Sequence, residues 1–185
     1  TGQILAMVGS RDYFDTAREG NFNVTLSRRQ PGSSIKPVVY ASAFEKGYDP
    51  QTVVFDFPTE FNPSCNPDGT PGAGVDPEKC YHPENYDQKY RGPVSFREAL
   101  AQSINVPSVK VSYLAGLKNS LRLAERLGIK TMTEPDRYGL TLVLGGGEVK
   151  LLELAGAYGV FASNGVLNLA TPILKVTNSA GETLE

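Results

Sequence analysis

The sequence predicts a single globular domain in which helices and short strands are mixed. Its 185 residues, 40% of them hydrophobic, suffice for one core and are too few for several domains. Segments with apolar residues at helical spacing alternate with short apolar runs that are bounded by glycine. The longest apolar stretch, about 151–162, is interrupted by Glu153 and by glycines. We therefore expect a buried helix there rather than a membrane span.

The charged residues are evenly mixed along the chain. The 18 basic and 20 acidic side chains give a formal net charge of −2, and no long run has one sign. This pattern does not suggest a surface that neutralises phosphates, so nucleic acid is not expected as a partner. Two cysteines and one histidine do not make a convincing zinc set, and we expect neither a metal nor a cofactor.

A strand and a helix are predicted in the first quarter of the chain. Residues 3–8 are apolar between two glycines, which predicts a buried strand. Residues 11–25 are polar and irregular. Residues 34–46 have apolar side chains at helical spacing and are followed by Gly47, which predicts a helix that is entered at or near Ser33.

A long irregular segment is predicted from residue 50 to residue 93, where eight of the 13 prolines lie. A loop of this length in a compact domain is usually functional or an insertion. Cys65 and Cys80 lie in it, and they are compatible with two free thiols or with a disulfide, which would need an oxidising compartment. His82 is the only histidine, and we expect it to be an exposed loop residue.

Helical signals return at Ser95. Ser95 and Glu98 form a capping box, which predicts a helix over 96–102. Pro107 predicts the first position of a second helix, so residues 103–105 should form the tight connection between the two. The remaining expectations are helices over 117–127 and 150–163, a short apolar run at 140–144, and a hairpin made of a strand at 171–177, a turn at 178–181 and a partner strand that opens at 182–185.

Ser33 and Lys36 form the first candidate catalytic pair. A serine hydroxyl is a weak nucleophile until a base takes its proton, and a spacing of three puts a lysine amine on the same helix face. The lysine must be neutral, which needs partial burial to lower its pKa. At a helix start, unpaired N–H groups would also face the group that the serine attacks, as one part of an oxyanion hole.

The spacing of this pair does not identify a site by itself. With 13 serines and nine lysines in 185 positions, independent placement gives about 0.6 Ser-x-x-Lys by chance. A capping serine beside a surface lysine is the competing interpretation.

Ser-x-Asn, a second candidate element, occurs at Ser64 and Asn66 and again at Ser103 and Asn105. The first copy lies in the proline-rich segment, whereas the second lies between two helices with clear sequence signals. Such a position provides the rigid support that a catalytic group requires. Ser103 and Asn105 are therefore the candidates, and a helix C-cap with a turn is the structural alternative.

Several motifs follow one another in a fixed order along the chain. They are Ala6-Met7-Val8-Gly9-Ser10-Arg11-Asp12-Tyr13, Gln30-Pro31-Gly32-Ser33-Ser34-Ile35-Lys36-Pro37, Tyr86-Asp87, Tyr90-x-Gly92, Ala99-Leu100-Ala101-x-Ser103-x-Asn105-Val106-Pro107, and Leu151-Leu152-Glu153-Leu154-Ala155-x-Ala157-Tyr158 with Phe161-Ala162-x-Asn164-Gly165. In this order they resemble the transpeptidase domain of the bimodular (class A) penicillin-binding proteins. The resemblance covers nearly the whole chain, and no single motif carries it.

The resemblance implies both a fold and a set of roles. The fold would be α/β of the α+β type, an antiparallel sheet with helices on both sides, as in penicillin-binding proteins and serine β-lactamases. Ser33 would be acylated by a donor stem peptide with release of D-alanine, and Lys36 would accept its proton. Ser103 would relay a proton to the leaving group, and Asn105 would bind the substrate amide. A second amine would then form the peptidoglycan crosslink, whereas a β-lactam antibiotic would acylate Ser33 and remain there.

The chain departs from the family pattern in lacking Lys-Thr-Gly. Lys130-Thr131-Met132 has no glycine and precedes the late helix instead of following it. We therefore expect residues 1–185 to be a partial domain without its final strands, catalytically incomplete unless a C-terminal segment supplies them. The resemblance also implies an upstream glycosyltransferase domain and a membrane anchor, neither of which is in this sequence, and a location on the outer face of the cytoplasmic membrane.

Other functions remain open at this stage. A D,D-carboxypeptidase would use the same residues with water as the acceptor. A β-lactamase-like hydrolase is less favoured, because no Glu-x-x-x-Asn loop is seen. A non-catalytic wall-binding module is opposed by the joint presence of all four candidate residues. A Ser-His-Asp hydrolase is opposed by the position of His82 in the irregular segment.

Overall fold

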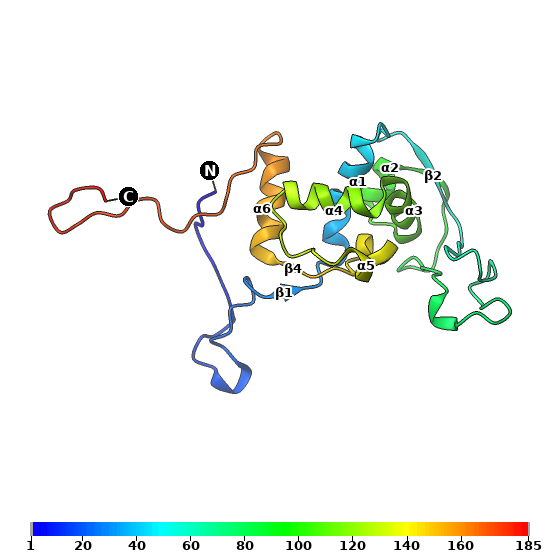
Figure 1. The fold of residues 1–185 in the computed structure, drawn as a ribbon, viewed down its shortest axis with the longest axis horizontal. Helices are drawn as coiled ribbons and strands as arrows, with labels where there is room; N and C mark the ends of the chain where they lie inside the picture. The colour runs from blue at the N-terminus through cyan, green and yellow to red at the C-terminus, as the bar shows by residue number, and fades with distance from the viewer. Residues whose placement is uncertain (1, 185) are drawn as a thin grey trace. The chain divides into compact units, whose positions relative to one another are not determined.

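The computed structural model describes residues 2–184, apart from the side chain at position 136. These residues group into two compact units (Figure 1). The first unit comprises 2–30, 124–133 and 148–184, and the second comprises 31–123 and 134–147. Helix α4 (Leu117–Arg126) contributes residues to both.

Three helices form the centre of the second unit. α1 (Lys36–Glu45) continues directly from the 3-10 turn η2 (Gly32–Ile35), and it packs against α2 (Phe96–Ala101) and α3 (Asn105–Ala115). A short helix, α5 (Pro135–Tyr138), leads into the 3-10 helix η4 (Gly139–Leu144), which packs on η2, α1 and α3. The run at 140–144 is thus helical. The predicted helices over 34–46 and 96–102 are confirmed within a residue or two.

Buried aromatic side chains hold these helices together. Tyr40 on α1 is fully buried, and its ring meets Phe96 on α2 edge to face, with 5.7 Å between centroids. The Tyr40 hydroxyl lies 3.1 Å from Ser108 Oγ on α3, which satisfies a polar group that would otherwise be buried without a partner. Burial raises the pKa of Tyr40 to about 12, so the hydroxyl keeps its proton. One side chain therefore ties α1 to both of its neighbours.

The ends of α2 and α3 show one confirmed prediction and one correction. Ser95 accepts from the Glu98 N–H, and Glu98 Oε2 accepts from the Ser95 N–H at 2.8 Å, so the capping box is confirmed. α3 begins at Asn105, two residues before Pro107. The prediction that Pro107 is the first helical position was wrong, because proline is tolerated at any of the first positions whose N–H has no intrahelical partner.

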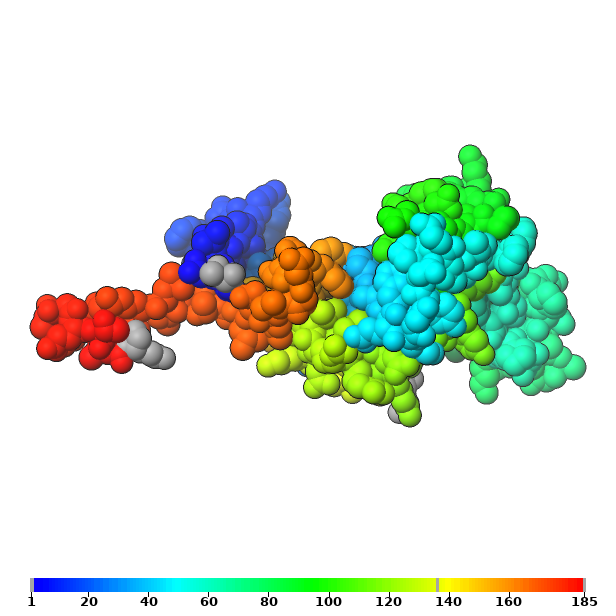
Figure 2. Space-filling view, turned by 90° about the horizontal axis from the view of Figure 1, so that it is seen from above, coloured from blue at the N-terminus to red at the C-terminus, as the bar shows by residue number. Residues whose placement is uncertain are grey.

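The segment between β2 (Val53–Asp56) and β3 (Gly92–Ser95) has little regular structure. The two strands pair antiparallel, with Val53 opposite Ser95 and Asp56 opposite Gly92. Between them lies one 3-10 turn, η3 (Pro77–Lys79), and the segment leaves the helices as an extended loop (Figure 1). Figure 2 shows it in teal as a lobe at the surface.

The first unit is made of one helix and short extended pieces. β1 (Arg28–Arg29) pairs antiparallel with β4 (Val149–Lys150), which leads directly into α6 (Leu151–Ala162), and η1 (Thr16–Arg18) is a 3-10 turn. The predicted buried strand at 3–8 was wrong. Gln3 makes a single bridge to Thr171, and the Leu5 side chain is 90% exposed, so the apolar run here does not pack into a core.

The C-terminal hairpin is present as a turn with a few bonds rather than as two regular strands. Asn178 N–H donates to Glu182 O and Leu184 N–H donates to Val176 O, while Thr177 bridges Thr183. The predicted turn at 178–181 is confirmed, and Glu185 lies outside the described residues.

The α+β class is confirmed. Among residues 2–184 the strands form two two-stranded sheets, β1 with β4 and β2 with β3, and both are antiparallel. None of the helices in this range is long and apolar enough to cross a bilayer.

Candidate active site

Ser33 lies on an exposed turn that continues into the buried helix α1. Gly32 has a φ of +56°, a conformation that glycine adopts without strain, and it turns the chain from Pro31 into η2. Ser33 is the second residue of η2, and its carbonyl accepts from the Lys36 N–H. The first backbone hydrogen bond of the turn is donated by the Ser34 N–H to Pro31 O. The Ser33 N–H comes before it in the chain and is not one of the donors within the turn. The nucleophile candidate thus combines an exposed hydroxyl with a rigid support.

The end of η4 lies against the turn that carries Ser33. Gly145 has a φ of +95°, and a Cβ at this position would overlap the backbone of Gly32. Only glycine allows this close approach of two backbones. Gly145, the first of the three glycines that follow the apolar run at 140–144, therefore packs against the turn that carries Ser33.

Lys36 is buried, and its amine reaches the connection between α2 and α3. The residue is 1% exposed. Nζ lies 2.7 Å from Ser103 O, 3.1 Å from Ser103 Oγ and 2.9 Å from Asn105 Oδ1. The structure thus brings together three of the four predicted site residues, although they lie 67 and 69 positions apart in sequence. Ser33 belongs to the same turn, but within the described chain its Oγ is not hydrogen-bonded to Lys36 Nζ.

Burial shifts the titration of Lys36. Desolvation of the ammonium lowers the pKa of Lys36 from 10.5 to about 8. At pH 7 about 9% of such lysines are neutral, against about 0.03% for a lysine with its ordinary pKa. When Nζ is neutral, the Ser103 hydroxyl is placed to donate to its lone pair, while the two remaining N–H groups donate to Ser103 O and Asn105 Oδ1.

Ser103 has an uncommon backbone conformation that aims two oxygen atoms at Lys36. Its φ is +55°, in the left-handed region that costs a side chain of this kind about 1 kcal/mol. The turn is closed by Ser103 N–H donating to Leu100 O and Ile104 N–H donating to Ala99 O. The predicted location in the connection between two helices is confirmed for Ser103.

Asn105 is the first residue of α3 rather than part of the connection. Its Oδ1 accepts from Lys36, and its Nδ2 donates to Glu84 O at 3.0 Å. Its backbone N–H donates to Asn85 Oδ1 at 3.1 Å. The sequence reasoning missed Glu84 and Asn85. The available signal was that both directly precede Tyr86-Asp87, which is one of the ordered motifs.

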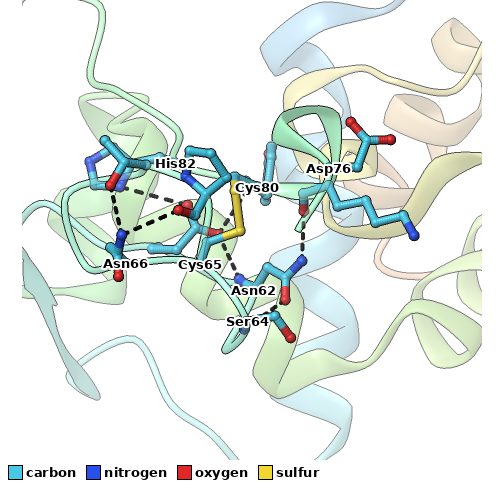
Figure 3. The surroundings of a disulfide bond; sticks show 12 residues. Asn62, Ser64, Cys65, Asn66, Asp76, Cys80 and His82 are labelled. Atoms are coloured by element: carbon cyan, nitrogen blue, oxygen red, sulfur yellow. Dashed lines mark hydrogen bonds and ion pairs between the residues drawn. A yellow bond between two sulfur atoms is a disulfide. The ribbon is translucent and has the colours of Figure 1, made fainter. Parts of the chain in front are cut away.

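The other Ser-x-Asn element belongs to a disulfide loop. Cys65 and Cys80 form a disulfide, and Ser64 and Asn66 lie on either side of Cys65 (Figure 3). Asn66 N–H donates to Thr70 O, and its Nδ2 donates to Thr70 Oγ1 at 2.9 Å. These contacts hold the loop closed, and they leave this copy of the motif with a structural role.

His82 is not the exposed residue that its position in a loop predicted. Its side chain is 20% exposed, and Nδ1 lies 3.9 Å from Oε2 of the buried Glu60. Glu60 Oε1 in turn accepts from the N–H groups of Asn62 and Tyr81. His82 lies beside the loop that the disulfide between Cys65 and Cys80 closes (Figure 3). Within the described part of the chain, no three His, Cys, Asp or Glu side chains gather as a metal site.

Lys130-Thr131-Met132 lies in the first unit and is hydrogen-bonded to a side chain of α6. Thr131 N–H and Oγ1 both donate to Glu153 Oε2, at 3.2 and 2.7 Å, and Met132 is buried. The Thr131 hydroxyl is therefore engaged with Glu153 on α6.

Comparison with known proteins gives consistent matches. The family model described as penicillin binding protein transpeptidase domain matches residues 1–178. Penicillin-binding protein 1A of Aquifex aeolicus is 36% identical over 186 residues, which cover 100% of this chain and 23% of that protein. Penicillin-binding protein 1A of Neisseria flavescens is 34% identical over 182 residues, covering 98% and 21%.

A solved structure agrees with these matches. The crystal structure of penicillin-binding protein 1A from Haemophilus influenzae superposes with a TM-score of 0.74 at 33% identity, over 89% of this chain and 23% of that one. The chain thus spans less than a quarter of the length of these relatives.

Proposed function

Because the chain belongs to the family of penicillin-binding protein transpeptidase domains, as its ordered motifs predicted, we propose that it crosslinks peptidoglycan stem peptides through an acyl-enzyme at Ser33. The observation that carries this proposal is the lysine that follows the serine by three positions. Lys36 is buried, its pKa is lowered to about 8, and its amine is held by Ser103 and Asn105. A surface lysine beside a capping serine would have none of these properties.

In the first step, Ser33 Oγ attacks the carbonyl carbon between the two terminal D-alanine residues of the donor peptide. The hydroxyl proton moves to neutral Lys36 Nζ, and an ester bond forms as the tetrahedral intermediate collapses. The scissile C–N bond breaks, and the leaving nitrogen takes a proton through the Ser103 hydroxyl, which lies 3.1 Å from Nζ. Free D-alanine departs, and Lys36 is neutral again.

In the second step, an amine of a neighbouring stem peptide attacks the ester. The new amide forms, one proton of the amine passes to Ser33 Oγ through the same groups, and the serine is regenerated. We propose that Asn105 binds the substrate amide with the N–H and the lone pair that its bonds to Glu84 O and Lys36 leave over. A β-lactam antibiotic would acylate Ser33 in the same way, but its ring nitrogen stays attached after the ring opens and blocks the second step.

The proposed location is the outer face of the cytoplasmic membrane, where peptidoglycan precursors are crosslinked. The disulfide between Cys65 and Cys80 supports an oxidising compartment. We propose an upstream glycosyltransferase domain and a C-terminal segment with a Lys-Thr-Gly element as partners of this chain, because its relatives are more than four times its length.

Labelling with a fluorescent penicillin tests the proposal. The full-length protein should take up one label, and mass spectrometry should find it on the peptide that contains Ser33. Ser33→Ala should abolish labelling, whereas Ser34→Ala, a matched change at the next position, should leave it. Absence of label from the wild-type protein, or label that persists in Ser33→Ala, would refute an acyl-enzyme at Ser33.

A second assay separates transpeptidation from hydrolysis. A stem pentapeptide donor is supplied together with an amine acceptor, and the products are identified and quantified by mass spectrometry. Crosslinked peptide supports the transpeptidase. A tetrapeptide without crosslinked product would identify a D,D-carboxypeptidase instead.

A further inference from the structure

The N-terminus of α3 lacks a cap from its own chain segment. Ile104 occupies the N-cap position and has no side-chain oxygen to accept from the first N–H groups of the helix. These N–H groups belong to Asn105 and Val106, and Val106 is fully buried. Water therefore cannot satisfy the Val106 N–H, and an acceptor must come from elsewhere.

The acceptor is the side chain of Asn85, which lies 20 residues earlier in the chain. Asn85 Oδ1 accepts from Asn105 N–H at 3.1 Å and from Val106 N–H at 3.0 Å. Asn85 is 3% exposed, so these two hydrogen bonds to the helix end are shielded from solvent. A residue of the segment between β2 and β3 thus performs the capping that Ile104 cannot.

The orientation of the Asn85 amide is fixed by its other end. Nδ2 donates to Asp56 Oδ1 at 2.7 Å and to Lys89 O at 2.8 Å. Asp56 is 0% exposed, and its second oxygen accepts from Arg91 N–H and lies 3.6 Å from the Arg91 guanidinium. With the amide flipped, its NH₂ would face two N–H donors and its oxygen would face a carboxylate, so only one orientation is satisfied.

We propose that Asn85 is a positioning residue for the active site, an inference that rests on the proposed function. Asn85 holds the backbone of Asn105 while the side chain of Asn105 reaches Lys36 Nζ. The adjacent carbonyl of Glu84 holds Asn105 Nδ2. Asn105 is therefore fixed at its N–H, its Nδ2 and its Oδ1, and two of these three contacts come from residues 84 and 85. The irregular segment thus supplies the contacts that hold Asn105 in reach of Lys36.

Two matched variants in the full-length protein test this role. Asn85→Ala removes the cap, and Asn62→Ala removes two solvent-exposed bonds in the same segment, to Lys79 O and from Ser64 N–H, without touching Asn105. Fluorescent penicillin gives both a rate constant of acylation at saturation and the fraction of protein labelled. Hydrogen exchange, read by mass spectrometry on a peptide that spans 103–108, reports the two capped N–H groups.

The expected result is a change in rate without a change in amount. Asn85→Ala should lower the acylation rate constant by about 10²-fold, because displacement of a reacting group by about 1 Å has effects of this size. Exchange of the two amides should accelerate about tenfold, while Asn62→Ala stays within about twofold of wild type in both measurements. A merely structural role would lower the labelled fraction, which follows the folded population, and would leave the rate constant of the folded protein unchanged. That outcome overturns the inference.

A paired substitution guards against a variant that does not fold. Asn85→Asp keeps an oxygen for the two N–H groups but sets a carboxylate against Asp56, so acylation should slow. Adding Asp56→Asn restores an N–H donor between the two side chains and should recover part of the lost rate. A folded double variant that stays as slow as Asn85→Asp contradicts the inference.

Failure of the proposed function can be told apart from failure of this inference. Wild-type protein that takes no label at Ser33 refutes the function. The exchange measurement needs no chemistry, so unchanged exchange of the Asn105 and Val106 amides in Asn85→Ala overturns the cap in either case.

Discussion

The rate of Ser33 acylation should depend on pH through Lys36. The pKa of Lys36 is lowered to about 8 by burial, and the neutral amine is the form that accepts a proton. The rate should therefore rise with pH through about 8 and fall below it. With this pKa the neutral fraction is about 1% at pH 6 and about 91% at pH 9, so the rate constant should rise about 90-fold over this interval.

The plateau at high pH distinguishes a buried lysine from an ordinary one. Between pH 9 and pH 10 the neutral fraction grows only about 1.1-fold for a pKa of 8, but about eightfold for a pKa of 10.5. The assay is stopped-flow acylation by a fluorescent penicillin in the full-length protein, corrected at each pH for spontaneous hydrolysis of the probe. A rate that is flat from pH 6 to 9, or that still rises eightfold above pH 9, would refute Lys36 as a base made neutral by burial.

Substitution of the lysine gives the matched control. Lys36→Arg keeps a cation but cannot release a proton at these pH values, so acylation should fall about 10³-fold. Lys110 also has a pKa lowered by desolvation, and its amine donates to Phe55 O rather than to Ser103 or Asn105. Lys110→Arg should leave both the rate and its pH midpoint unchanged. Equal losses in the two variants would show that the effect is not specific to Lys36.

Three further outcomes are expected. Ser103→Ala leaves the carbonyl on Lys36 but removes the hydroxyl that relays the proton, so penicillin acylation should fall about 10²- to 10⁴-fold while the melting temperature changes by only a few degrees. Gly145→Ala has to accommodate both a φ of +95° and overlap with a backbone, so denaturant titration should show a loss of about 3 kcal/mol of unfolding free energy, against about 1 kcal/mol for Gly74→Ala, where φ is +74° and the space is open. Cys65→Ser combined with Cys80→Ser should lower the unfolding free energy by at most about 3 kcal/mol, measured in the same way, and a larger loss would contradict a loop-closure effect.

The parts of the site that depend on local sequence could be predicted. The spacing of Ser33 and Lys36 within one turn, the capping box at Ser95 and the glycine that ends α1 are all set by neighbours within four residues, where backbone geometry determines the outcome. The preference for Ser103 over Ser64 also followed from local helix signals, and the structure places Ser103 on Lys36.

The parts that depend on distant segments could not be predicted. The apolar run at 3–8 has the pattern of a buried strand, but a strand is defined by its partner, and only Gln3 finds one, 168 positions away at Thr171. The start of α3 was misplaced by two residues because Pro107 is equally compatible with several first-turn positions. Periodicity describes a segment and does not state what the segment contacts.

The lowered pKa of Lys36 shows why the local motif and the distant segment act as one site. The amine is neutral in part because it is desolvated, and the groups that cover it are Ser103 and Asn105, which lie 67 and 69 positions later. Asn105 in turn is hydrogen-bonded to Asn85 and Glu84 at the start of α3. Ser-x-x-Lys is expected by chance in a chain of this composition, and the spacing by itself only brings the two side chains close together. The fold supplies the burial that leaves part of the Lys36 amine neutral near pH 7.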